Sequence, residues 1–133
     1  MTLQQFLNQN TVDKISKEVI ISDRFKDENG ELFKFKIKPM NQATFEDIKK
    51  KASFGGVGGE INDDTLNCFI VIESTIYPSF KDSESLASLG CSSPKQYLNK
   101  VLLAGEIAYL ADEIISLSGF DRGIEDFIAD AKN

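Results

Sequence analysis

Alternating apolar and charged positions near the N-terminus form the clearest local pattern in the chain. Phe33, Phe35 and Ile37 alternate with lysines at positions 34, 36 and 38, and a period of two places each set on one face of a strand. The preceding segment Asp27–Gly30 suits a type I turn followed by a glycine in the left-handed conformation. The pattern therefore predicts a β-hairpin with one face in the core and the other in water.

The length of the connecting loop sets the register of this hairpin. A two-residue Asn-Gly loop would place Phe25 opposite Lys34, an apolar residue against a charged one. A three-residue loop instead gathers the apolar residues of both strands on one face, so we expect the bulged turn. The resulting cross-strand pairs are Phe25 with Phe33, Asp23 with Phe35, and Ile21 with Ile37.

The outer face of the predicted hairpin is basic. Such a face can contact an acidic partner, but charged strand faces more often only keep a sheet solvated, and we favour the solvated face. Its expected members are Ser22, Arg24, Lys34, Lys36 and Lys38.

A helix is predicted after Pro39, which ends the hairpin. Asn41 or Thr44 can cap this helix, which runs to about Ser53. Its last turns hold Lys49–Lys51, where the helix dipole favours cations. The lysine run therefore has a local explanation that does not require nucleic-acid binding.

Four of the nine glycines fall in Gly55–Gly59, where the entropy of the glycine backbone disfavours helix and strand, so we predict a loop. From Asn62 or Asp63 to about Tyr77, apolar residues surround the axis and predict a buried central helix. The β-branched run Ile70–Ile72 also permits a strand, but the length and the acidic start of the segment favour a helix.

Three further helices are predicted in the C-terminal half. The first spans Asp82–Leu89 and the second spans Ser93–Gly119, with a capping-box start and a bend expected at Gly105. The third begins at Asp121, after which apolar residues repeat at the i, i+3, i+4, i+7 spacing of one helical face.

The pattern as a whole predicts an α+β fold, with an N-terminal β-hairpin followed by a mainly α-helical bundle. We expect a single domain over residues 1–133, divided into a hairpin and first helices (1–54), a glycine-rich loop (55–59) and a helical part (60–133). A length of 133 residues with 41% hydrophobic residues is enough for one buried core.

Charge is unevenly distributed along the chain, whose net charge is −6. Residues 1–59 hold ten basic and eight acidic side chains, a net +2, whereas residues 60–133 hold five and thirteen, a net −8. The acidic total argues against a dedicated nucleic-acid or membrane-surface binder. The unlike halves predict that any head-to-tail contacts between copies would be salt-sensitive.

The composition offers little for catalysis. The chain has no histidine, which removes histidine-based nucleophilic catalysis and the commonest metal ligand. Cys68 and Cys91 lack metal-ligand or redox-pair spacing and are expected to be free thiols. The adjacent carboxylates of Asp112 and Glu113 point about 100° apart on a helix and form no site by themselves. We therefore expect no enzyme, no cofactor, no metal and no secretion or membrane segment.

Several stretches together resemble the XkdN-like phage tail assembly chaperones, in order and spacing over nearly the full length. These stretches are Asp23–Gly30, the strand ending at Ile37–Pro39, Leu102–Glu106 with its helix to Leu117–Asp121, and Ile124–Phe127 with Ala131–Asn133.

The resemblance implies a non-catalytic protein of phages or prophages that acts in the cytoplasm of the bacterial host and is absent from the mature virion. It would bind the tape measure protein and keep it soluble while tail tube protein polymerises around it. The tail tube protein is a further candidate partner, and a homo-oligomer is a further candidate state. The resemblance also implies that this chain is the shorter of two translational forms.

A chaperone of this kind needs an apolar surface that covers a client helix and later releases it. The alternatives are a virion structural or head-tail connector protein and an enzyme with a carboxylate-based metal site. Each candidate partner-binding residue is also a candidate core residue, because apolar stripes on short helices are usually buried in their own domain. These candidates are Tyr97, Leu98, Val101, Leu102, Tyr109, Phe120 and Phe127.

Overall fold

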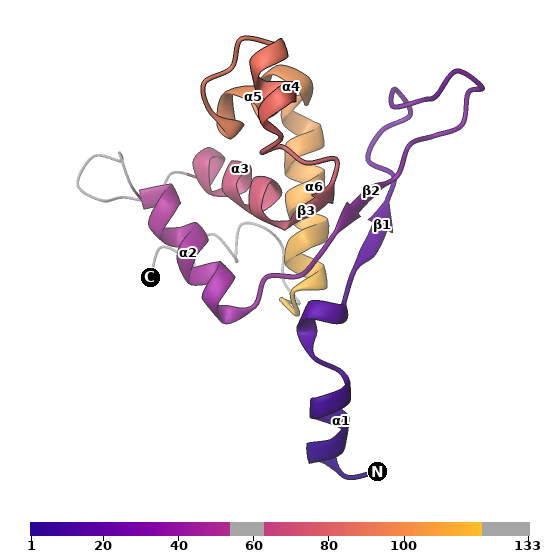
Figure 1. Ribbon diagram of the computed structural model, residues 1–133, viewed down its shortest axis with the longest axis vertical. Coiled ribbons are helices and arrows are strands. Elements are labelled where there is room, and N and C mark those ends of the chain that lie inside the picture. The colour runs from indigo at the N-terminus through magenta and orange to yellow at the C-terminus, as the bar shows by residue number, and fades with distance from the viewer. Residues whose placement is uncertain (54–62, 121–133) are drawn as a thin grey trace.

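The molecule combines a small sheet with a set of helices, and the computed structural model describes residues 1–53 and 63–120. The α+β class is confirmed (Figure 1). The glycine-rich loop 55–59 and the helix expected from Asp121 lie outside the described residues. The elements are α1 (Leu3–Gln9), a 3-10 helix (Val12–Lys14), β1 (Lys17–Val19), β2 (Phe35–Ile37), α2 (Gln42–Ser53), α3 (Asp63–Ser74), β3 (Thr75–Tyr77), α4 (Ser83–Ser88), α5 (Pro94–Val101) and α6 (Ala104–Leu117).

Several helix starts fall where the capping residues predict them. Asn41 accepts a backbone hydrogen bond at 2.8 Å at the start of α2, Asp82 caps α4 and Ser93 caps α5. Gln96 completes only half of the expected capping box, because its side-chain oxygen accepts from the amide of Ser92 rather than from that of Ser93. These starts depend on hydrogen bonds between residues close together in sequence.

The sheet has a third strand where the pattern predicts the end of the central helix. The strand order is β1-β2-β3, and both pairings are antiparallel. α3 ends at Ser74, and the next three residues form β3 instead of a last helical turn. Thr75 and Ile76 are β-branched and suit a strand, and pairing with β2 satisfies backbone groups that a helix end would leave without partners.

The tip of the hairpin has the predicted turn and register. The Gly30 amide donates to the Asp27 carbonyl at 3.1 Å, and Gly30 has a φ of 82°, as expected for a type I turn followed by a left-handed glycine. The Phe33 amide donates to the Phe25 carbonyl at 2.8 Å. The predicted pairing of Phe25 with Phe33 is therefore confirmed.

The predicted register is wrong at the base of the hairpin. The pairs there are Val19 with Phe35 and Lys17 with Ile37, in place of Asp23 with Phe35 and Ile21 with Ile37. The shift is four residues, an even number, so Phe35 still faces the core. Residues 20–24 lie outside the paired strands. Arg24 leaves the predicted basic stripe and reaches Glu106 in α6 instead.

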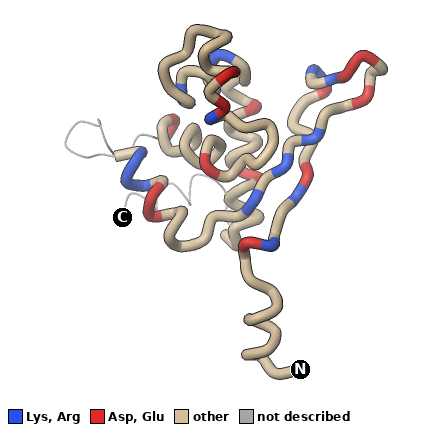
Figure 2. Tube along the Cα trace, viewed as in Figure 1, with Lys and Arg blue, Asp and Glu red and all other residues tan. Residues whose placement is uncertain are grey.

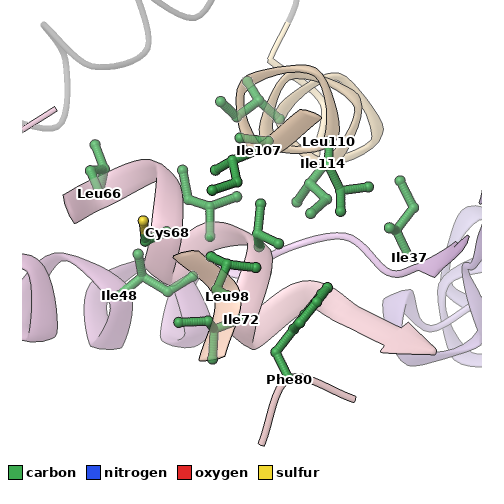
Figure 3. Close-up of a cluster of buried hydrophobic side chains, with 14 of the residues drawn as sticks. Ile37, Ile48, Leu66, Cys68, Ile72, Phe80, Leu98, Ile107, Leu110 and Ile114 are labelled. Atoms are coloured by element: carbon green, nitrogen blue, oxygen red, sulfur yellow. The ribbon is translucent and has the colours of Figure 1, made fainter. Parts of the chain in front are cut away.

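The core surrounds α3, which packs against α2, α5 and α6. Figure 3 shows side chains from these helices meeting in one cluster, among them Ile48 of α2, Leu98 of α5 and Ile114 of α6, each fully buried. Cys68 belongs to the same cluster, and burial raises the pKa of its thiol. Its expected role as a small core residue is confirmed, and Cys91 is also a free thiol.

The long helix expected over residues 93–119 is divided into α5 and α6. The break lies at Leu102–Leu103 rather than at Gly105. The Glu106 side chain accepts a hydrogen bond from the Leu103 amide at 2.8 Å and so caps the start of α6. The cap therefore explains a new helix start at Ala104 without a bend at Gly105.

Candidate functional site

An apolar groove lies between the hairpin, the segment after β3, and α5. We call it the α5 groove; its cavity volume is about 260 Å³. Apart from one lysine, its lining side chains are apolar or aromatic. They are Phe25, Phe33, Lys34, Phe35, Tyr77, Pro78, Phe80, Tyr97, Val101 and Leu102.

The groove has a buried floor and an exposed rim. Phe35 and Phe80 are almost fully buried in the floor, whereas Phe33 and Tyr77 are 49% and 63% exposed. The floor is braced by aromatic contacts, with ring centroids 5.1 Å apart for Phe25 and Phe35 in an edge-on arrangement. The rim residues can therefore contact a partner without unpacking the core.

An ion pair holds the hairpin against the break between α5 and α6, beside the groove. Arg24 donates from Nε and Nη2 to the two carboxylate oxygens of Glu106, and from Nη2 to the Val101 carbonyl at 2.8 Å. Glu106 is only 7% exposed, and the hydrogen bonds from Arg24 lower the pKa of its carboxyl. A two-point contact of this kind orients both partners.

The structure brings together three of the residues predicted to bind a partner. Tyr97, Val101 and Leu102 line the α5 groove, although Leu102 is also part of the core. Leu98, between them on α5, is fully buried in the core. The partner-binding role of this set remains a prediction.

The other three candidates do not line the groove where the structure describes them. Tyr109 is 47% exposed on α6. Phe120 packs against Phe45, with ring centroids 5.8 Å apart, and Phe127 lies outside the described residues.

Half of the groove was not predicted from the sequence. The pairing of Phe25 with Phe33 follows from the turn, but no local signal shows that the hairpin lies against α5. Tyr77 was assigned to the central helix, and only its strand conformation brings it to the rim. Its position directly before Pro78 is a signal that could have shortened that helix.

Several charged side chains, including two of the lysines of α2, form ion pairs with acidic neighbours. Figure 2 shows both basic and acidic positions along the hairpin, and Lys36 of β2 lies opposite Glu18 of β1. In the lysine run of α2, Lys51 lies 2.8 Å from Glu73 and 3.2 Å from Asp47. These contacts support a structural role for the lysine run.

Over residues 1–53 and 63–120, no three cysteine, aspartate or glutamate side chains come together as a metal-binding group. In the same part of the chain, no helix is both long and apolar enough to cross a lipid bilayer.

Comparison with known proteins places this chain in a family. Residues 3–132 match the family described as Phage XkdN-like tail assembly chaperone protein, so the chain belongs to that family. It is 29% identical to phage-like element PBSX protein XkdN of Bacillus subtilis (strain 168), over 98% of this chain and 93% of that protein. Protein YqbN of the same organism shows the same identity and coverage. A crystal structure of YqbN superposes with a TM-score of 0.73 and 27% identity, covering 91% of this chain and 98% of that one.

Proposed function

We propose that this protein is a non-catalytic chaperone that binds the tape measure protein of its phage or prophage and keeps it soluble while the tail tube forms. It would act in the host cytoplasm and be absent from the mature virion, with the tail tube protein as a second contact. Membership of the tail assembly chaperone family supports the general role. The α5 groove is the observation that supports client binding.

The groove suits protein side chains better than a small molecule. Its lining is apolar or aromatic apart from Lys34, whereas sites for small molecules usually add placed polar groups that fix the ligand's orientation. An amphipathic helix presents apolar side chains at i, i+3 and i+4 and can insert them between such walls. The exposed rim residues Phe33 and Tyr77 would gain most from being covered.

Co-expression with the tape measure protein tests this proposal. We expect the tape measure protein to be largely insoluble alone, and to be soluble and to co-purify when this chain is present. Tyr77→Asp places a charge on the groove rim and should abolish capture. Ile76→Asp is the matched control, because Ile76 is the neighbouring exposed residue of β3 and does not line the groove.

Circular dichroism must show that both variants are folded before capture is compared. Loss of capture in Tyr77→Asp with capture retained in Ile76→Asp supports the groove as the client site. A folded wild-type chain that neither binds nor solubilises the tape measure protein would show that the proposal is wrong. Detection of the chain in purified tails would favour the virion structural or connector alternative.

A further inference from the structure

Helix α1 carries an apolar stripe that the described part of the chain leaves exposed. Leu3, Phe6 and Leu7 lie at i, i+3 and i+4, which is one face of a helix, and they are 74%, 49% and 54% exposed. No residue of α1 is buried. Figure 1 shows α1 extending away from the body of the molecule, beyond the base of the hairpin.

This helix is too short to be stable without a partner. It has seven residues, and isolated helices of fewer than about 12–15 residues are marginal in water. Its start is well capped. The Thr2 hydroxyl accepts a hydrogen bond from the Gln5 amide, and the Gln5 side chain accepts one from the Thr2 amide. Capping alone does not bury the stripe, however, and helices in proteins gain most of their stability from packing an apolar face.

The helix also lies within the region that the family model matches. The family match begins at residue 3, which is the first residue of α1. The apolar stripe is therefore inside the matched region.

The chemistry of α1 matches that of the α5 groove. Residues 1–12 contain no aspartate, glutamate, lysine or arginine, and among the groove-lining residues only Lys34 is charged. An uncharged helix loses little hydration of charge when it enters an apolar groove. Three apolar side chains on one face are the pattern that helix-in-groove docking requires.

We propose that α1 of one copy docks in the α5 groove of a second copy of this chain. Within one copy the two surfaces lie apart, because α1 extends beyond one end of the hairpin while α5 lies toward the other (Figure 1). Each copy then donates one helix and receives one. Such contacts close as a reciprocal dimer or a ring, or continue as a filament. The α5 groove is also the site proposed above for the client, so α1 of a second copy and the client would compete for it.

Sedimentation of the full chain over a dilution series tests the docking with two matched pairs of variants. Phe6→Asp charges the apolar stripe, whereas Asn8→Asp puts the same charge on another face of α1. Phe33→Asp charges the groove rim, whereas Leu32→Asp charges the neighbouring exposed residue, which does not line the groove. We expect the wild type and both controls to associate, and Phe6→Asp and Phe33→Asp to weaken association about thirtyfold or more, as loss of an anchor residue does.

Mixing the two disabled variants gives the sharpest result. Phe6→Asp keeps an intact groove and Phe33→Asp keeps an intact helix, so a mixture of the two should associate more strongly than either variant alone. If circular dichroism shows that Phe6→Asp is unfolded, Leu7→Asp replaces it. Tyr77→Asp replaces Phe33→Asp in the same way.

Three results would overturn the proposal. A wild-type chain that is a monomer at all concentrations excludes docking between copies and leaves α1 to a site on its own chain. If Phe33→Asp associates as strongly as the wild type, α1 does not use the groove. A mixture that remains monomeric means that the helix and groove are not donor and acceptor. No tape measure protein is present in these experiments, so their failure is separate from failure of the proposed client binding.

Discussion

Arg24 and Glu106 are 82 positions apart in sequence and are joined by two hydrogen bonds, from Nε at 2.7 Å and from Nη2 at 2.6 Å. Arg24 lies in the hairpin between β1 and the turn. Glu106 caps the start of α6. The same guanidinium contacts the last residue of α5. This pair therefore positions the two walls of the α5 groove relative to each other.

The Arg24–Glu106 pair predicts a loss of stability in acid. Hydrogen bonds from Arg24 lower the pKa of the Glu106 carboxyl below its ordinary 4.5, so on acidification the unfolded chain takes up this proton before the folded chain does. The stabilisation is complete above pH 4.5 and is lost as the pH falls through the lowered folded pKa. Urea midpoints measured between about pH 6 and pH 3 should fall less steeply in Glu106→Gln than in the wild type.

Glu73 also contributes to the loss of stability in acid, and it is the same in the wild type and in Glu106→Gln. Burial raises its pKa, but hydrogen bonds from Lys51 and Lys81 outweigh burial, and the net pKa is lowered. Because Glu73 is unchanged in Glu106→Gln, the difference between the two pH profiles reports Glu106. Parallel profiles would mean that the pair does not couple stability to pH.

Two of the partner-binding candidates should differ sharply in their effect on folding. Leu98 is fully buried and Tyr109 is 47% exposed. Leu98→Ala should lower the free energy of unfolding by about 2–5 kcal/mol, whereas Tyr109→Ala should change it by no more than about 0.5 kcal/mol. Urea unfolding measures both. Equal effects would contradict the assignment of Leu98 to the core.

Alanine substitutions at Gly30, in the bulged turn, and at Gly105, in α6, should change the free energy of unfolding in opposite directions. Gly30 has a φ of 82°, and an alanine there would cost roughly 1–2 kcal/mol because its Cβ crowds the following carbonyl. Gly105 lies in α6 with open space around its Cβ position, so Gly105→Ala should stabilise the chain by about 0.5–1 kcal/mol. Denaturant unfolding of the two variants checks the sign of each effect.

Self-association should be insensitive to salt. Several ion pairs already join the basic and acidic halves within one molecule: Lys17–Glu113, Arg24–Glu106 and Lys51–Glu73. Docking of the uncharged α1 should therefore persist in light scattering above about 0.15 M salt, where charge attraction is screened beyond about 8 Å. Dissociation at that salt concentration would instead favour contacts between the unlike halves of neighbouring copies.

The sequence alone determined features that depend on residues close together in the chain. The turn at Asp27–Gly30, the caps at Asn41, Asp82 and Ser93, and the α+β class were all predicted correctly. A turn or a cap forms within a few residues, so its side chains and backbone groups are specified locally. Cys68 was predicted as a core residue for a similar reason, because its segment is apolar on all sides.

Only the tertiary structure decided the end of α3, the register at the base of the hairpin, and the groove. Residues 75–77 become a strand because β2 offers a backbone partner, and Arg24 leaves the basic stripe because Glu106 lies within reach. The α5 groove joins Phe33 of the hairpin to Tyr97 of α5, far apart in the chain. Contacts of this kind depend on how separate elements pack, and no repeat or spacing within one element specifies them.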